Sequence, residues 1–237
     1  MNNKRVLILT GTSNIKRDPN ETDNTMEEVF DLTLSSKQKY AKKHGYDILA
    51  MRSFWSDKNN IFDDKQLGFL RALCTFDMLT NYDIVMWVDA DAIITNDEIT
   101  VQDFKLDDEH SLYVSYDWTG MASFSTGNFI LQKTKHIDEL YKAFVNIGKQ
   151  VYDGNHWGEE QTTFNHLYKA TPLKNTIKIL EHDYLNAVPI QVMESEFWAN
   201  RQPVKWPWNK NSFLAHITAV SNVHRIKILK NNFKEYI

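Results

Sequence analysis

Apolar residues in the first hundred positions form short runs that alternate with stretches of helical spacing. The runs predict buried strands over Arg5–Thr10, Tyr46–Met51 and Asp83–Val88. Between them, Met26–His44 and Asp63–Leu79 have the spacing of amphipathic helices. Strands that alternate with helices in this way predict a parallel sheet covered by helices.

The pattern after residue 100 is less regular and predicts a mixed half. We expect strands over Ser111–Tyr116, Gly127–Gln132, Thr176–Leu180 and Phe213–Ala215. We expect helices over Ile137–Val151 and Glu159–Tyr168, and a basic helix over His224–Tyr236. No repeat, low-complexity segment or Pro/Gly linker divides the sequence. The fold class predicted is therefore α/β, with one domain over 1–237 and one continuous sheet shared by both halves.

Composition supports the prediction of one α/β domain and limits the classes of function that fit the chain. With 237 residues, 42% hydrophobic and 24% charged, the chain can bury a full core. A net charge of −4 gives no electrostatic signature of nucleic-acid binding. Cys74 is the single cysteine, which excludes an intrachain disulfide and indicates a buried thiol in a reducing compartment. No signal peptide and no apolar segment of the ~18–20 residues that span a bilayer is visible, so we expect a soluble, cytoplasmic protein.

The strand over Asp83–Val88 ends on two acids, Asp89 and Asp91. Open α/β sheets bind ligands at the carboxyl ends of their strands. Two neighbouring carboxylates repel each other unless a cation lies between them, and such hard oxygen ligands favour Mg²⁺ or Mn²⁺, ions that usually carry phosphates. An isolated acidic pair is often only a solvated turn. Here the strand before it is too apolar to lie at a surface, which favours a metal–diphosphate site.

Further segments accompany this pair in a fixed order. They are Lys43-His44-Gly45-Tyr46, the helix from Lys65 to Arg71 before Asp89-Ala90-Asp91-Ala92, Ser125–Ile130, Trp157–Gln161 and Phe213–His216. Together they resemble the retaining GT-A glycosyltransferases that include fungal α-galactosyl- and α-mannosyltransferases and plant xyloglucan xylosyltransferases. The chain departs from that family at Ser125, where the family has Asn, and after His216, where Ile-Thr-Ala replaces Phe-Ala-Gly. The membrane anchor usual in the Golgi members is not visible in these residues, so we expect a bacterial or viral enzyme.

The resemblance implies a single GT-A catalytic domain, with about 1–100 binding the nucleotide-sugar and about 101–237 completing the metal site and binding the acceptor. It implies a UDP- or GDP-sugar donor, a glycan or glycoprotein acceptor, and Mn²⁺ or Mg²⁺. Asp91 and His216 would hold the metal, with Asp89 reaching the metal or the ribose. An imidazole ligand favours Mn²⁺ over Mg²⁺.

The remaining candidate residues fall into three groups. The donor-binding set is Thr10, Gly11, Thr12, Lys65, Asp89, Ala90 and Gly127; the sugar-facing catalytic set is Glu159, Glu160 and Gln161; the acceptor-side set is Trp118, Trp206 and Trp208. Each has a structural alternative: the acids suit a helix start, Lys65 a solvated helix, and the tryptophans a packed loop. Gln161 would steady the transition state in a one-face reaction. In a double displacement Glu160 would be the nucleophile.

Two other functions compete with this one. Aspartyl-nucleophile phosphohydrolases and phosphotransferases also carry an Asp-x-Asp pair, but directly after the first strand, whereas here the first strand ends in Leu-Thr-Gly. A non-catalytic nucleotide-sugar-binding module is the second alternative. Retention of Asp89, Asp91, Gln161 and His216 together argues against a decayed site.

Overall fold

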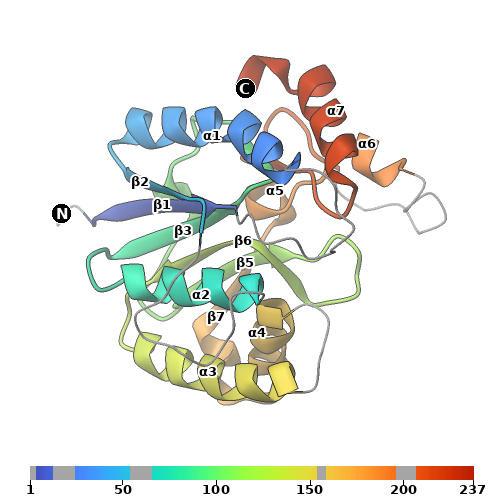
Figure 1. Cartoon of the computed structure of the whole chain (residues 1–237). Helices are drawn as coiled ribbons and strands as arrows, with labels where there is room; N and C mark the ends of the chain where they lie inside the picture. Colours follow the sequence, from blue (N-terminus) through green and yellow to red (C-terminus); the bar gives the residue numbers. More distant parts are fainter. Residues whose placement is uncertain (1–3, 13–24, 54–65, 154–158, 196–206) are drawn as a thin grey trace.

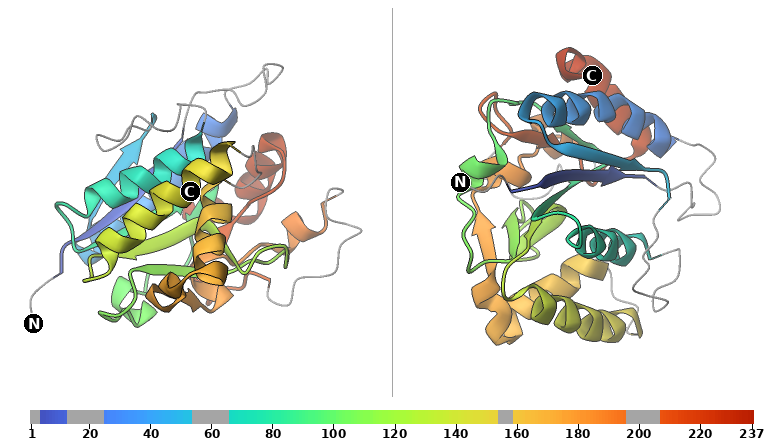
Figure 2. Two further views of the ribbon diagram at one scale, coloured as in Figure 1. Left: turned by 90° about the horizontal axis from the view of Figure 1, so that it is seen from below. Right: turned by 90° about the vertical axis from the view of Figure 1, so that its left-hand side faces the viewer.

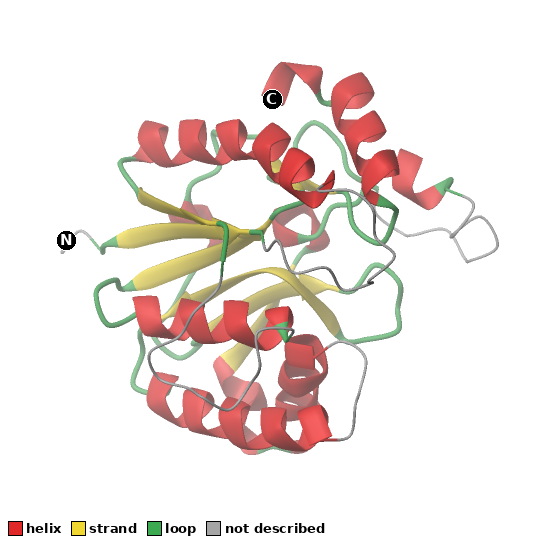
Figure 3. Ribbon diagram, viewed as in Figure 1, coloured by secondary structure: helices red, strands yellow, loops and turns green. Residues whose placement is uncertain are grey.

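The computed structural model describes residues 4–12, 25–53, 66–153, 159–195 and 207–237. A twisted sheet lies between two helical layers, with α1 and α7 on one side and α2, α3 and α4 on the other (Figures 1 and 2). Helices and strands alternate along the first half, as predicted (Figure 3). The helices are α1 Thr25–His44, α2 Leu67–Met78, α3 Ile137–Asp153, α4 Glu159–Ala170, α5 His182–Leu185, α6 Ile190–Met193 and α7 Asn222–Asn232. Short 3₁₀ turns cover Val101–Phe104, Pro172–Thr176 and Lys234–Tyr236.

Six strands form the main sheet in the order β2-β1-β3-β6-β5-β7. They are β1 Val6–Gly11, β2 Asp47–Met51, β3 Ile84–Asp89, β5 Leu112–Tyr116, β6 Phe124–Gln132 and β7 Ile177–Leu180. β1 pairs in parallel with β2 and β3, and β5 with β7, while β6 runs antiparallel between β3 and β5. The predicted α/β fold and shared sheet are confirmed. A second sheet pairs β4 Ala92–Ile94 with β8 Leu214–His216, and the sequence did not predict its first strand.

Both faces of β3 are buried, as its continuous apolar run predicted. Val85 and Trp87 pack among residues of α2, α3 and α4, where the rings of Phe144 and Phe164 lie 4.5 Å apart. Met86 and its neighbours on the other face pack against α1 and β8. Fully burying one such side chain contributes about 1.5–3 kcal/mol. These two cores fix the direction of β3 and hence the place where Asp89 leaves the sheet.

Helix α2 begins at Leu67, four residues later than predicted, after a Gln66 whose side chain makes no capping hydrogen bond. The amide of Gly68 instead donates to Glu159 Oε2 at 2.7 Å. A carboxylate 91 positions away in sequence therefore caps this helix, which no local pattern reveals. Strand β6 likewise begins at Phe124 rather than Gly127. Cys74 is buried, as expected.

Within the described ranges, none of the helices has both the length and the apolar character needed to cross a membrane.

Candidate active site

Two strand ends bring the three predicted metal ligands together. Asp89 is the last residue of β3, and Asp91 occupies the turn into β4. The antiparallel β4–β8 pair sets Ala92 opposite His216. As a result, His216 Nε2 lies 3.3 Å from Asp91 Oδ1 and 3.8 Å from Asp89 Oδ2, and one ligand atom from each residue falls within 4.8 Å of the others.

The chemistry of this cluster fits a divalent cation. His216 Nδ1 is hydrogen-bonded to Asn186 Oδ1 at 2.9 Å, which fixes the ring and leaves Nε2 as the lone-pair atom. His216 is 2% exposed, and its Nε2 has no hydrogen-bond partner among the residues described. A Cβ at Gly127 would lie 3.0 Å from that nitrogen and 3.1 Å from Asp89 Oδ2. Only glycine lets the backbone of β6 approach these two side chains so closely.

The two aspartates have different electrostatic surroundings. Burial raises the pKa of Asp89, and the Asp91 charge raises it further, against the pull of Arg71. Asp89 Oδ1 accepts hydrogen bonds from Arg71 Nη1 at 2.5 Å and Trp87 Nε1 at 2.8 Å. Burial also opposes ionisation of Asp91, but the charge of Arg225, together with the adjacent His216 ring, outweighs it and holds the pKa of Asp91 well below its usual range. Asp91 is therefore the more firmly ionised of the two carboxylates.

A buried polar clamp from α1 fixes the backbone between the aspartates. Lys37 is fully buried, and its Nζ donates to the Asp89 carbonyl at 2.8 Å and to Thr33 Oγ1 at 3.0 Å. Thr33 Oγ1 in turn donates to the Ala90 carbonyl at 2.6 Å. The predicted donor-site residue Ala90 is thus buried and held through its carbonyl group. Burial lowers the pKa of Lys37 to about 7, although Asp91 and Asp89 raise it.

Arg71 joins the aspartates to the start of α4. Its second guanidinium nitrogen, Nη2, donates to Glu160, which also accepts from Thr126 Oγ1 at 2.9 Å. The side chain of Glu160 is 4% exposed. Gln161 Oε1 accepts from the Thr126 amide at 3.1 Å. The Asp-x-Asp and Glu-Glu-Gln segments therefore belong to one hydrogen-bonded assembly.

Residues 2–113 match the sequence profile of the galactosyl transferase GMA12/MNN10 family. The fold is similar to a solved glycosyltransferase involved in glycosylation of the major capsid of PBCV-1, with TM-score 0.65 and 15% identity over 95% of this chain and 98% of that one. The chain has the GT-A fold of these glycosyltransferases, and the family match covers residues 2–113. The predicted resemblance to this family is therefore confirmed over residues 2–113, and the predicted GT-A-like fold over the described chain.

Two further solved structures share the fold of this chain. Galactosyltransferase LgtC, solved with donor and acceptor sugar analogs, has TM-score 0.53 and 13% identity, covering 98% of this chain and 100% of that one. Mouse xyloside xylosyltransferase 1 has TM-score 0.56 and 10% identity, and the match covers 92% of this chain and 99% of that one. No curated protein matches the sequence.

Residues predicted to receive the donor lie beside the cluster. Gly11 pairs in register with Asp89, so Thr10, Gly11 and Thr12 end β1 at the same edge of the sheet. The hydroxyl groups of Thr10 and Thr12 are buried and make no hydrogen bond within the described part of the chain. Lys65 lies outside the described residues.

The predicted acceptor-side tryptophans are partly buried where the structure describes them. Trp118 packs against the cluster formed by β4, α6, β8 and α7. Trp208 Nε1 donates to Thr95 Oγ1 at 3.0 Å, and its ring meets Phe233 edge-on at 4.9 Å. Trp206 lies outside the described residues. The visible contacts of Trp208 are those of a packed side chain, which was the structural alternative.

Several residues of the assembly were not assigned from the sequence. In the sequence, Arg225 and Lys37 belong only to predicted helices, and Arg71 and Asn128 only to segments that carry the family resemblance. Asn128 accepts from the Asp89 amide at 2.9 Å and so aligns the end of β3. None of these positions carries a local signal, because their partners come from distant segments.

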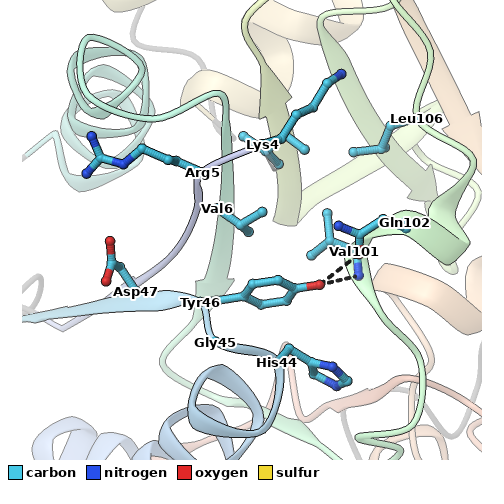
Figure 4. Close-up of a pocket in the computed structure, with 11 residues that line it drawn as sticks. Lys4, Arg5, Val6, His44, Gly45, Tyr46, Asp47, Val101, Gln102 and Leu106 are labelled. Carbon is cyan, nitrogen blue, oxygen red and sulfur yellow. Dashed lines mark hydrogen bonds between the residues drawn. The ribbon is translucent and has the colours of Figure 1, made fainter. Parts of the chain in front are cut away.

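A separate cavity of about 600 Å³ lies at the amino ends of β1 and β3, the opposite edge of the sheet from Asp89. Figure 4 shows the ring of Tyr46 pointing across it, with the hydroxyl group hydrogen-bonded to Gln102 at 2.8 Å. Lys4, Val6 and Leu106 also line it. It contains none of the predicted site residues.

Proposed function

We propose that this chain is a glycosyltransferase that transfers a sugar from a UDP- or GDP-sugar to a hydroxyl group of a glycan or glycoprotein, with retention of anomeric configuration and with Mn²⁺ or Mg²⁺. The observation that carries this proposal is the cluster of Asp89, Asp91 and His216, in which a buried imidazole nitrogen lacks a hydrogen-bond partner among the described residues, beside a glycine where a side chain would crowd the ligand atoms. Such a mixed oxygen and nitrogen set suits Mn²⁺.

In this proposal Asp91 and His216 hold the cation, and Asp89 reaches the cation or the ribose. When bound, the cation stabilises the negative charge that develops on the departing nucleoside diphosphate. Arg71 keeps Asp89 fixed relative to Glu160. The buried hydroxyl groups of Thr10 and Thr12 receive the nucleoside, since a ligand would satisfy them.

The sugar itself faces the start of α4. Glu160 is buried and shared between Arg71 and Thr126, which supports a positioning role over that of an attacking nucleophile. Gln161 is more exposed than Glu160 and is held through its carbonyl oxygen, so its amide nitrogen can approach the reacting sugar. This arrangement supports the one-face reaction. Glu159 caps α2 and so fixes α4 against it.

The test is Mn²⁺-stimulated release of nucleoside diphosphate from a panel of UDP- and GDP-sugars. We expect Asp91→Ala to abolish release, because it removes the more firmly ionised ligand. Asp108→Ala is the matched control, since its side chain is 89% exposed and its hydrogen bonds to described residues are with Lys4 and Gln132. Full activity and metal stimulation in Asp91→Ala would contradict the proposal.

A further inference from the structure

Arg225 of α7 occupies one side of the metal ligand Asp91. Its Nε donates to Asp91 Oδ2 at 2.9 Å and to the Ile217 carbonyl at 3.0 Å, and its Nη1 donates to Asn222 Oδ1 at 2.7 Å. The other oxygen of Asp91, Oδ1, faces His216. The carboxylate group of Asp91 therefore lies between the guanidinium group of Arg225 and the imidazole of His216.

The second aspartate is shared in the same way. Asp89 Oδ1 is bonded to Arg71, while Oδ2 faces His216. Both ligand carboxylates are thus paired with guanidinium groups, which stay charged at any ordinary pH. A free divalent cation entering the cluster meets carboxylates whose charge is already compensated, and two positive groups oppose it at short range.

Arg225 repels a free divalent cation, but it attracts a cation that is bound to a diphosphate. Within the described part of the chain, its remaining nitrogen, Nη2, makes no hydrogen bond, and the side chain is 16% exposed rather than sealed. Guanidinium groups bind phosphate oxygens through strong charge-assisted hydrogen bonds. A cation that arrives on a diphosphate brings the negative charge that Arg225 attracts.

We propose that Arg225 makes the site selective for a divalent cation bound to a diphosphate over the free cation. This rests on the proposed metal–diphosphate site. Arg225 both occupies an oxygen of Asp91 and offers a donor to phosphate, so its two effects on binding have opposite signs. A residue that only positioned Asp91 would affect both ligands in the same direction.

The experiment compares the binding of Mn²⁺ alone with the binding of UDP and of GDP in saturating Mn²⁺, by calorimetry and by the electron paramagnetic resonance signal of free Mn²⁺. In Arg225→Gln we expect Mn²⁺ alone to bind about threefold or more tightly, because Asp91 loses its competing partner. The nucleoside diphosphate should bind about tenfold more weakly, because a charge-assisted phosphate contact is lost.

Two further variants control the result. Lys230→Gln removes a positive charge from the same helix, at a side chain 53% exposed and paired with Glu28, and should change neither affinity. Arg225→Lys keeps the charge and should keep the weak binding of free Mn²⁺, even if Arg225→Gln fails to fold. Equal weakening of both ligands in Arg225→Gln, or no change in either, overturns the proposal. If the parent protein itself binds neither nucleotide with Mn²⁺, the proposed function fails as well.

Discussion

Gly127→Ala places one methyl group inside the proposed cation site. The new Cβ would collide with His216 Cε1 and lie 3.0 Å from its Nε2 and 3.1 Å from Asp89 Oδ2. Metal–nitrogen and metal–oxygen bonds are about 2.0–2.2 Å long, so a carbon this close to two ligand atoms takes the space of the ion. His216 cannot easily retreat, because Asn186 holds its ring and Ala187 accepts its amide at 2.8 Å.

The expected cost follows from these contacts. Overpacking a buried position costs about 1–3 kcal/mol. At about 2–4 °C per kcal/mol for a domain of this size, the fall in Tm is about 2–12 °C. Saturating Mn²⁺ with UDP or GDP should stabilise the parent by about 2.7 kcal/mol at a hundred times Kd. The variant should show no such gain. Thermal unfolding with and without ligand measures both effects.

Gly45→Ala is the matched control. Gly45 has φ +67°, but a Cβ there meets nothing within 4 Å, so the substitution costs only the strained backbone, about 1–2 kcal/mol. It should lower Tm and keep the full ligand-dependent gain. If Gly127→Ala also keeps that gain, the cation does not lie between His216 and Asp89, and the reasoning is refuted.

Two other substitutions test the surroundings of the site. Burial lowers the pKa of Lys37 from 10.5 to about 7 in the folded protein. Between these two pH values the unfolded chain binds more protons than the folded one. The free energy of unfolding of the metal-free protein therefore rises with pH across this range because of Lys37. Lys37→Met should abolish that gain, and Tm values at about pH 7 and pH 9 that change as in the parent would contradict it. Ala219 has φ +57°, which favours glycine, so Ala219→Gly should add up to about 1 kcal/mol and raise Tm by about 2–4 °C. A fall in Tm would show that this strain is absent.

Most of the sheet could be predicted from the sequence because the apolar residues that become buried recur at the spacing of strands and helices. The apolar run of β3 is buried on both faces, and the helical spacing of α1 and α3 matches the faces they bury. The missed strand β4 has only three residues, too few for a period to show. The start of α2 was misplaced because Glu159, and no neighbour in sequence, caps it.

The acidic pair was predictable because it interrupts an apolar strand, and His216 because of the order of the motifs. Lys37 was not, because lysine in an amphipathic helix is expected in solvent, whereas here the Asp89 carbonyl group and Thr33 Oγ1 accept hydrogen bonds from its buried ammonium group. Arg225 and Asn186 serve the site only through tertiary contacts, about which residue type and spacing carry no information.

The β4–β8 pair makes the site dependent on the order in which the chain is synthesised. The aspartates belong to the first hundred residues, whereas His216 reaches them only through a strand pair that joins residues more than a hundred positions apart. During translation, an unfinished chain therefore carries both carboxylates without the imidazole. Long-range pairings of this kind form slowly. In refolding, we expect affinity for Mn²⁺ and diphosphate to arise later than the β1–β3 core. Sugar donors would then be bound only by chains in which β4 and β8 have paired.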